Sequence, residues 1–409
     1  MTARGAAAIL AALVLVFAAC GRDGADDTEG ASNRLLVLGD DGNIFTVLPD
    51  GSDRVDITDD AGEGRGYLQP TWSPMGERIA WSELRLEPGR SRSFLRTGRS
   101  DGTDVTGAEI AATAFYLYWN PDGERLVHLS RGIGGLDLGL IDVAAGGDAS
   151  VVLDQGQPYY FSWSPDGKRL LVHVGDRRLE LLALDGGRTT VDDAPGLFQA
   201  PQWSRDGTRI IYAAQGNSDQ ALVLADPEGG SARRLVTFDG FIAFALNSEG
   251  DRVAYRVTTG RPDVPETAVL AGGPRRAIPD ALVVLDLTSG EELVLASDPV
   301  LAFYWSPHGR SLLFLVVDLE SGLLRWHVWE GEQVMAFEAF QPSVVFAQEY
   351  LPFFDQFAQS QSFWSPGSDA FVYAGTGMDE RSGIWVQRVE PGIGPALVVA
   401  GQFASWSPG

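Results

Sequence analysis

The stretch that decides the fold is YYFSWSPDGKRLLV, residues 159–172. It predicts a strand that ends at Trp163, a turn over residues 164–167, and a returning strand from Arg169. The turn chemistry is specific, because Pro fixes φ at the second turn position, Asp bonds to neighbouring backbone, and Gly accepts the left-handed conformation. The stretch therefore predicts a β-hairpin.

Variants of this hairpin recur along the chain, 40 to 60 residues apart. Their tryptophans are Trp72, Trp119, Trp163, Trp203, Trp305, Trp364 and Trp406, and a degenerate copy has Ala245 in the tryptophan position. A strand-turn-strand repeat of about forty residues is typical of β-propellers with four-stranded blades, and no helical period competes with it. The predicted fold class is therefore all-β, a single propeller of four-stranded antiparallel blades.

The last copy of the motif, residues 406–409, supplies a first strand and nothing after it. The first ordered segment offers the three missing strands, at residues 34–39, 43–48 and 54–58. We expect the C-terminal strand to pair with this N-terminal blade and close the ring, so that no sheet edge is left free. Counting first strands predicts eight blades, with seven as the alternative. The tryptophans are expected to pack between neighbouring sheets.

The repeated motif resembles the WD-like propeller repeat of TolB-type periplasmic proteins. Residues 163–167 (WSPDG) match it in full, whereas residues 120–123 and 205–207 match in part, and the resemblance covers residues 34–409. The resemblance implies the fold. Members of the family include scaffolds that dock other envelope proteins and propellers fused to peptidase domains, so it implies no single activity.

The N-terminus has the features of an export signal. Residues 1–20 contain one early Arg4 and an apolar run over residues 6–19, which is too short to span a bilayer core of about 30 Å but suits a signal peptide. Cys20 follows small residues, as in a bacterial lipobox, and it is the only cysteine, so no intramolecular disulfide is possible. The alternative is an ordinary secretory signal with an incidental cysteine.

We therefore expect Cys20 to be lipidated and to anchor the protein to the outer face of the cytoplasmic membrane, or in the periplasm or outer membrane of a Gram-negative cell. Residues 21–33 are polar and acidic, as in a disordered tether, and the propeller domain then covers residues 34–409.

Composition argues against several classes of function. The formal charge is −24, with a single lysine, and such an acidic chain disfavours nucleic acid. The four histidines, His128, His173, His308 and His327, are scattered along the sequence. Metal sites need clustered ligands. We therefore predict no catalytic residue, no metal and no cofactor.

The first candidate binding surface is formed by residues that precede each tryptophan. First strands are innermost in a propeller, so their starts should lie near one mouth of the central channel. Aromatic and amide side chains there suit the recognition of a peptide or small molecule, although they could instead plug the channel. These residues are Tyr67, Gln69, Tyr116, Tyr159, Tyr160, Phe198, Gln199, Phe241 and Phe303.

An aromatic-rich insertion over residues 340–357 is the second candidate. Phe353, Phe354, Asp355 and Gln356 combine apolar bulk with a carboxylate and an amide, as interface anchors do, but the segment could equally be a lid with buried aromatics. We expect a monomeric, non-enzymatic scaffold that binds a protein or peptide of the cell envelope. The alternatives are a propeller enzyme, such as a lyase, lactonase or glycan-acting hydrolase, and a small-molecule or sugar sensor.

Overall fold

The Trp-Ser-Pro-Asp-Gly hairpin forms as its sequence predicts. Strands β12 (Tyr159–Trp163) and β13 (Arg169–Val174) pair antiparallel on either side of the turn. The Ser164 hydroxyl accepts the backbone N–H of Arg169 at 3.0 Å, and Gly167 adopts a left-handed φ of 66°. Serine therefore closes the turn, and glycine supplies the conformation that other residues avoid.

The same closing bond recurs in other copies of the motif. The accepting hydroxyls belong to Ser73, Ser204, Ser306 and Ser365, and Asn120 and Asn247 use their side-chain carbonyl in the same way. Asparagine can replace serine here because either side chain places an oxygen where the backbone donor points.

The computed structural model describes residues 33–192, 194–216, 219–228, 230–258 and 275–409. The predicted signal peptide, Cys20 and the tether up to residue 32 lie outside these residues, as do residues 259–274. Within the described residues, no helix is long and apolar enough to cross a membrane.

Most strands belong to four-stranded antiparallel sheets. One sheet joins the two ends of the described chain, with the order β3 (Val55–Asp56), β2 (Ile44–Val47), β1 (Leu35–Leu38) and β32 (Phe403–Trp406). The next contains β4 (Arg65–Trp72), β5 (Arg78–Glu87), β6 (Arg90–Arg99) and β7 (Thr106–Ile110). A third contains β8 (Ala114–Trp119), β9 (Arg125–Gly132), β10 (Gly135–Asp142) and β11 (Ser150–Gly156).

The remaining sheets follow in chain order. Strands β12 and β13 continue into β14 (Arg178–Ala183) and β15 (Arg188–Asp192). The next sheet contains β16 (Gln202–Trp203), β17 (Ile210–Gln215), β18 (Gln220–Ala225) and β19 (Ala232–Phe238). The sheet after it contains β20 (Phe241–Leu246), β21 (Arg252–Thr258), β23 (Leu282–Asp286) and β24 (Glu292–Ala296).

The prediction of uniformly four-stranded, antiparallel sheets is wrong in two places. β22 (Arg275–Arg276) adds to β19 as a parallel fifth strand. The last large sheet has seven strands, because the long β28 also pairs with β29 through Gln341 and Pro342. Its strands are β25 (Val300–Trp305), β26 (Ser311–Val317), β27 (Leu324–Glu330), β28 (Gln333–Pro342), β29 (Ala370–Thr376), β30 (Ser382–Arg388) and β31 (Ala396–Val399).

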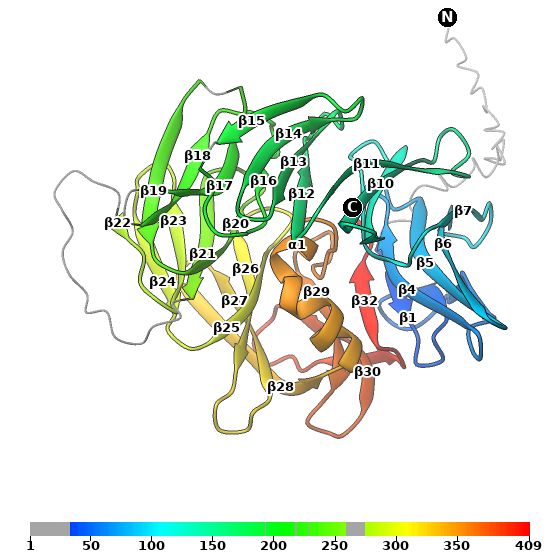
Figure 1. The fold of residues 1–409 in the computed structure, drawn as a ribbon. Coiled ribbons are helices and arrows are strands. Elements are labelled where there is room, and N and C mark those ends of the chain that lie inside the picture. Colours follow the sequence, from blue (N-terminus) through cyan, green and yellow to red (C-terminus); the bar gives the residue numbers. More distant parts are fainter. Residues whose placement is uncertain (1–32, 193, 217–218, 229, 259–274) are drawn as a thin grey trace, which may run out of the picture.

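A short helical segment interrupts the last sheet. It consists of the π-helix η1 (Phe346–Tyr350), the 3-10 helix η2 (Leu351–Phe353) and the α-helix α1 (Phe354–Phe357). Figure 1 shows this segment, in orange, in the middle of the molecule, with the sheets arranged around it. The chain then reaches the copy of the motif at Trp364. Instead of a full first strand, this copy has a single isolated antiparallel bridge between Trp364 and Phe371.

Candidate functional site

The motif tryptophans join neighbouring sheets. Trp163 Nε1 donates to the carbonyl oxygen of Tyr118 at 3.2 Å, and Trp364 Nε1 donates to that of Tyr304 at 3.0 Å. Trp72 and Trp305 make the same kind of bond, to Ser405 at 3.4 Å and to Ala245 at 2.8 Å. The predicted packing of the tryptophans between sheets is thus confirmed.

A cavity of about 770 Å³ opens where the Trp-Ser-Pro turns converge. We call this end of the molecule the turn face. The tryptophans and prolines in the cavity wall include Trp72, Pro74, Trp119, Pro121, Trp163 and Pro165. Residues 358–363, which follow α1, also line it.

The polar groups of this cavity are amides and hydroxyls, apart from one cation. Arg205 is the only charged side chain among the lining residues that the structure describes. Gln202 is held by the backbone of β20, and Gln359 donates to the carbonyl oxygen of Pro201 at 3.4 Å. The side-chain oxygen of Gln361 is buried, with no hydrogen-bond partner among the described residues. The lining suits recognition, and its guanidinium can pair with an anionic group.

The helical segment fills the centre of the molecule from the opposite end, where β4, β8 and β12 begin. We call residues 343–361 the plug and this end the plug face. The Gln356 side chain accepts the N–H of Phe161 at 2.9 Å and donates to the carbonyl oxygen of the same residue at 2.7 Å. It also donates to the Tyr116 hydroxyl at 2.9 Å. One side chain thereby satisfies both backbone groups of an inner strand residue.

Aromatic side chains also pack the plug against the inner strands. Tyr350 stacks on Phe403 of β32, with ring centroids 3.8 Å apart, and Phe357 lies edge-on to Tyr116 of β8 at 5.0 Å. Phe354 meets Phe303 of β25 at 5.0 Å. The alternative in which the insertion buries most of its aromatic side chains is therefore confirmed. Phe353 is the exception, because it is 49% exposed.

Asp355 lies at the plug face among neutral hydrogen-bond donors. Its carboxylate accepts the backbone N–H of Gln356 at 3.0 Å, the Tyr160 hydroxyl and the backbone N–H of Ala200. Burial raises the pKa of Asp355 to about 6, although these hydrogen bonds favour the charged form. Among the residues that the structure describes, it forms no ion pair.

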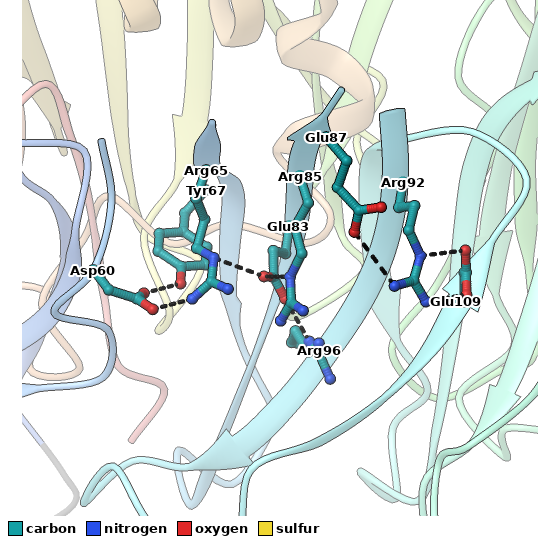
Figure 2. A network of polar contacts seen from close by, with 9 residues as sticks. All are labelled: Asp60, Arg65, Tyr67, Glu83, Arg85, Glu87, Arg92, Arg96 and Glu109. Carbon is teal, nitrogen blue, oxygen red and sulfur yellow. Dashed lines mark hydrogen bonds and ion pairs between the residues drawn. The ribbon is translucent and has the colours of Figure 1, made fainter. Parts of the chain in front are cut away.

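Tyr67 belongs to a polar network on the sheet β4–β7. Its hydroxyl donates to Asp60, which also pairs with Arg65 (Figure 2). At the centre of the network is Glu83, whose side chain is 3% exposed and contacts Arg65, Arg85 and Arg96. These ion pairs and hydrogen bonds give each charged group a partner on the same face of the sheet, so Tyr67 has a structural role here.

Most other predicted candidates are also buried and bonded. Tyr159 donates to Asp154 at 2.7 Å, and Gln69 donates to Glu349 of the plug at 3.2 Å. Gln199 contacts His173 at 3.0 Å, where burial lowers the pKa of the imidazole. Phe241 is 61% exposed. The structure brings Tyr160, Phe198, Gln199 and Asp355 together. The Tyr160 ring packs on Phe198, which precedes Gln199 in the sequence, and the Tyr160 hydroxyl bonds to Asp355.

None of the predicted candidates lines the turn-face cavity, which sequence reasoning missed. Its walls are built from the motif itself, whose residues were assigned to the fold alone. Arg205 was the available signal, since it replaces the usual proline in the motif at residues 203–207 and adds a cation to that turn. Within the described part of the chain, no group of three or more His, Cys, Asp or Glu could hold a metal ion.

Comparison with solved structures agrees with this architecture. A eukaryotic initiation factor is similar, at 10% identity over 92% of this chain and 99% of that chain, with a TM-score of 0.54. Prolyl endopeptidases are similar at 15% identity over 84% of this chain and 50% of theirs, with a TM-score of 0.53. TolB from Acinetobacter baumannii matches at 17% identity, with a TM-score of 0.39.

The TolB match spans 67% of this chain and 65% of TolB, slightly less than two thirds of its length. No family model and no curated protein matches the sequence. At identities of 10 to 17% these likenesses concern the fold alone. The order of the sheets, together with these matches, confirms the predicted β-propeller fold.

Proposed function

We propose that this protein is a non-enzymatic propeller of the cell envelope that binds a segment of another protein in the turn-face cavity. The observation that carries the proposal is the lining of that cavity: tryptophans, prolines and amides together with a single cationic side chain, Arg205. Its volume of about 770 Å³ falls within the usual range for binding pockets and suits a few residues of a peptide.

The same lining favours binding over catalysis. Hydrolysis or elimination requires a group that moves a proton near neutral pH, usually His, Asp or Glu. The lining residues that the structure describes include none of these, and an arginine side chain keeps its proton in proteins. Arg205 instead fits a carboxylate of the bound segment.

We infer that the propeller has eight blades and is closed between its two ends. β32 pairs with β1, from Leu38 opposite Phe403 to Leu35 opposite Trp406. The backbone N–H of Trp406 also donates to the carbonyl oxygen of Ser362 at 2.7 Å, which links this blade to the preceding one. Trp72 supplies the link to the following blade through its bond to Ser405.

We further propose that Cys20 carries the lipid anchor, that residues 21–33 tether the propeller, and that the protein is a monomer. Fractionation of cells tests the anchor. The wild-type chain should partition with membranes, whereas Cys20→Ala should be released by washing without detergent. Equal partitioning of the two chains would overturn the anchor.

Binding is tested by charge reversal in the cavity. We expect Arg205→Glu to reduce recovery of a co-purified envelope protein by about tenfold, the loss of roughly 1.4 kcal/mol of binding energy. Lys168→Glu is the matched control, because it makes the same charge change in a neighbouring turn but outside the cavity lining. Unchanged recovery with Arg205→Glu, or equal losses with both variants, would contradict the proposal.

A further inference from the structure

Asp355 has an unusual environment for a carboxylate in a folded protein. It is partly exposed at the plug face, yet no arginine, lysine or histidine of the described chain pairs with it. A carboxylate that loses hydration without gaining a cation is costly, and proteins normally avoid this arrangement by pairing the charge.

The hydrogen bonds to Asp355 leave acceptor capacity unused. The donors are the backbone N–H groups of Gln356 and Ala200 and the hydroxyl of Tyr160. An ionised carboxylate has about four lone-pair sites, so at least one remains for a further donor. Because the three donors are neutral, they orient the carboxylate and leave its charge uncompensated.

Tyr160, whose hydroxyl bonds to Asp355, packs against a second aromatic ring. Tyr160 and Phe198 pack with their ring centroids 4.4 Å apart, and both remain partly exposed. Aromatic faces attract organic cations, and a carboxylate next to them adds a full negative charge.

We propose that Tyr160, Phe198 and Asp355 form a binding site for an organic cation, and that its occupant is a basic side chain, preferably arginine, of a partner protein. A guanidinium can lie flat against an aromatic ring while its edge donates to a carboxylate. The formal charge of −24 favours a basic partner as well, because the long-range field accelerates its approach. None of these residues lines the turn-face cavity, so the site does not depend on the function proposed there.

Asp355 could also serve only to fasten the plug to β12 and to the loop at Ala200. A purely structural carboxylate would bind no cation, and its substitution would change stability alone. Binding measurements with defined probes therefore separate the two roles.

The test uses the full chain in detergent micelles and three fluorescently labelled peptides, Gly-Xaa-Gly-Gly, in which Xaa is arginine, lysine or the neutral analogue citrulline. At pH 8 the arginine peptide should bind at least about tenfold more tightly than the citrulline peptide, with lysine between them. Its affinity should fall about tenfold at pH 5, where a carboxyl with a pKa of about 6 is mostly protonated.

Asp355→Asn should abolish the preference for arginine, whereas Glu320→Gln, which neutralises an exposed carboxylate between β26 and β27, should preserve it. Phe198→Leu, a second variant that leaves the carboxylate in place, should weaken arginine binding several-fold. Equal affinity for arginine and citrulline, an arginine preference that survives Asp355→Asn, or no measurable binding would overturn the site.

Discussion

Glu83 shows how a single buried charge organises one sheet face. Its carboxylate oxygens accept hydrogen bonds from Arg85 and Arg96, and Arg65 Nε lies 3.3 Å from Glu83 Oε1 (Figure 2). Glu83→Gln should lower the free energy of unfolding by about 1–3 kcal/mol at pH 7, because three arginines would lose their shared carboxylate. Urea denaturation measures this loss.

The loss of unfolding free energy in Glu83→Gln should become smaller as the pH falls. Burial alone would raise the pKa of Glu83, but hydrogen bonds from Arg85 and Arg96 outweigh it, so the pKa is lowered in the folded state. The stabilisation is therefore present above the ordinary glutamate pKa and disappears as the pH falls through the folded value. Glu109→Gln, at an exposed pair with Arg92, should leave stability nearly unchanged; a loss as large as that of Glu83→Gln would contradict this account.

Asp355 should show the opposite pH dependence. Its pKa is raised from 3.8 to about 6, so the folded state binds more protons and loses stability as the pH rises through this interval. Asp355→Asn should raise the free energy of unfolding by about 1–3 kcal/mol at pH 8 and give no gain near pH 4. Denaturation at both pH values measures the difference, and a variant less stable than wild type at pH 8 would refute it.

At the level of elements, the plug should contribute to stability through its buried side chains. Tyr350→Ala and Phe357→Ala should each cost about 3–5 kcal/mol, because both rings are almost fully buried against inner strands. Phe353→Ser, at the half-exposed position of the same segment, should cost little. Similar losses at all three positions would mean that the segment contributes as a whole and not through these rings.

The hairpins were predictable because their determinants are local. Turn chemistry at residues 164–167 fixes the hairpin within a few positions, and the period of the tryptophans indicates how such hairpins assemble. The parallel pairing of β22 and the joining of β28 to β29 were not predictable, since they depend on neighbours distant in the sequence. Local patterns contain no information about such partners.

The candidate site was predictable only in part, for the same reason. Tyr116 and Phe303 were predicted to lie near a mouth of the channel, but the sequence could not show that Phe357 and Phe354 pack against them. The turn-face cavity arises from turns that are close together only after the sheets assemble. Its distinguishing residue, Arg205, looked like an ordinary variation in a repeat.

For the whole molecule, the proposed closure predicts that β32 stabilises the complete fold. Ser405 is opposite Leu36 in the β1–β32 pair, so Ser405→Pro should cost about 2–4 kcal/mol by removing a central donor and straining the strand. Val398→Pro, in the outer strand β31, is the control and should cost less because outer edges tolerate proline. Calorimetry should show one cooperative transition lowered by Ser405→Pro; a greater effect of Val398→Pro would contradict closure.

The most direct test of the central claim is site-specific photocrosslinking from the turn-face cavity in intact cells. A photoreactive amino acid replaces Gln359 in the cavity or, as the control, the exposed Thr189 of the outer strand β15. The account predicts one reproducible protein adduct from position 359 that is absent from position 189 and lost when Arg205→Glu is added. No adduct from position 359, or the same adduct from both positions, would contradict a protein-binding function of this cavity.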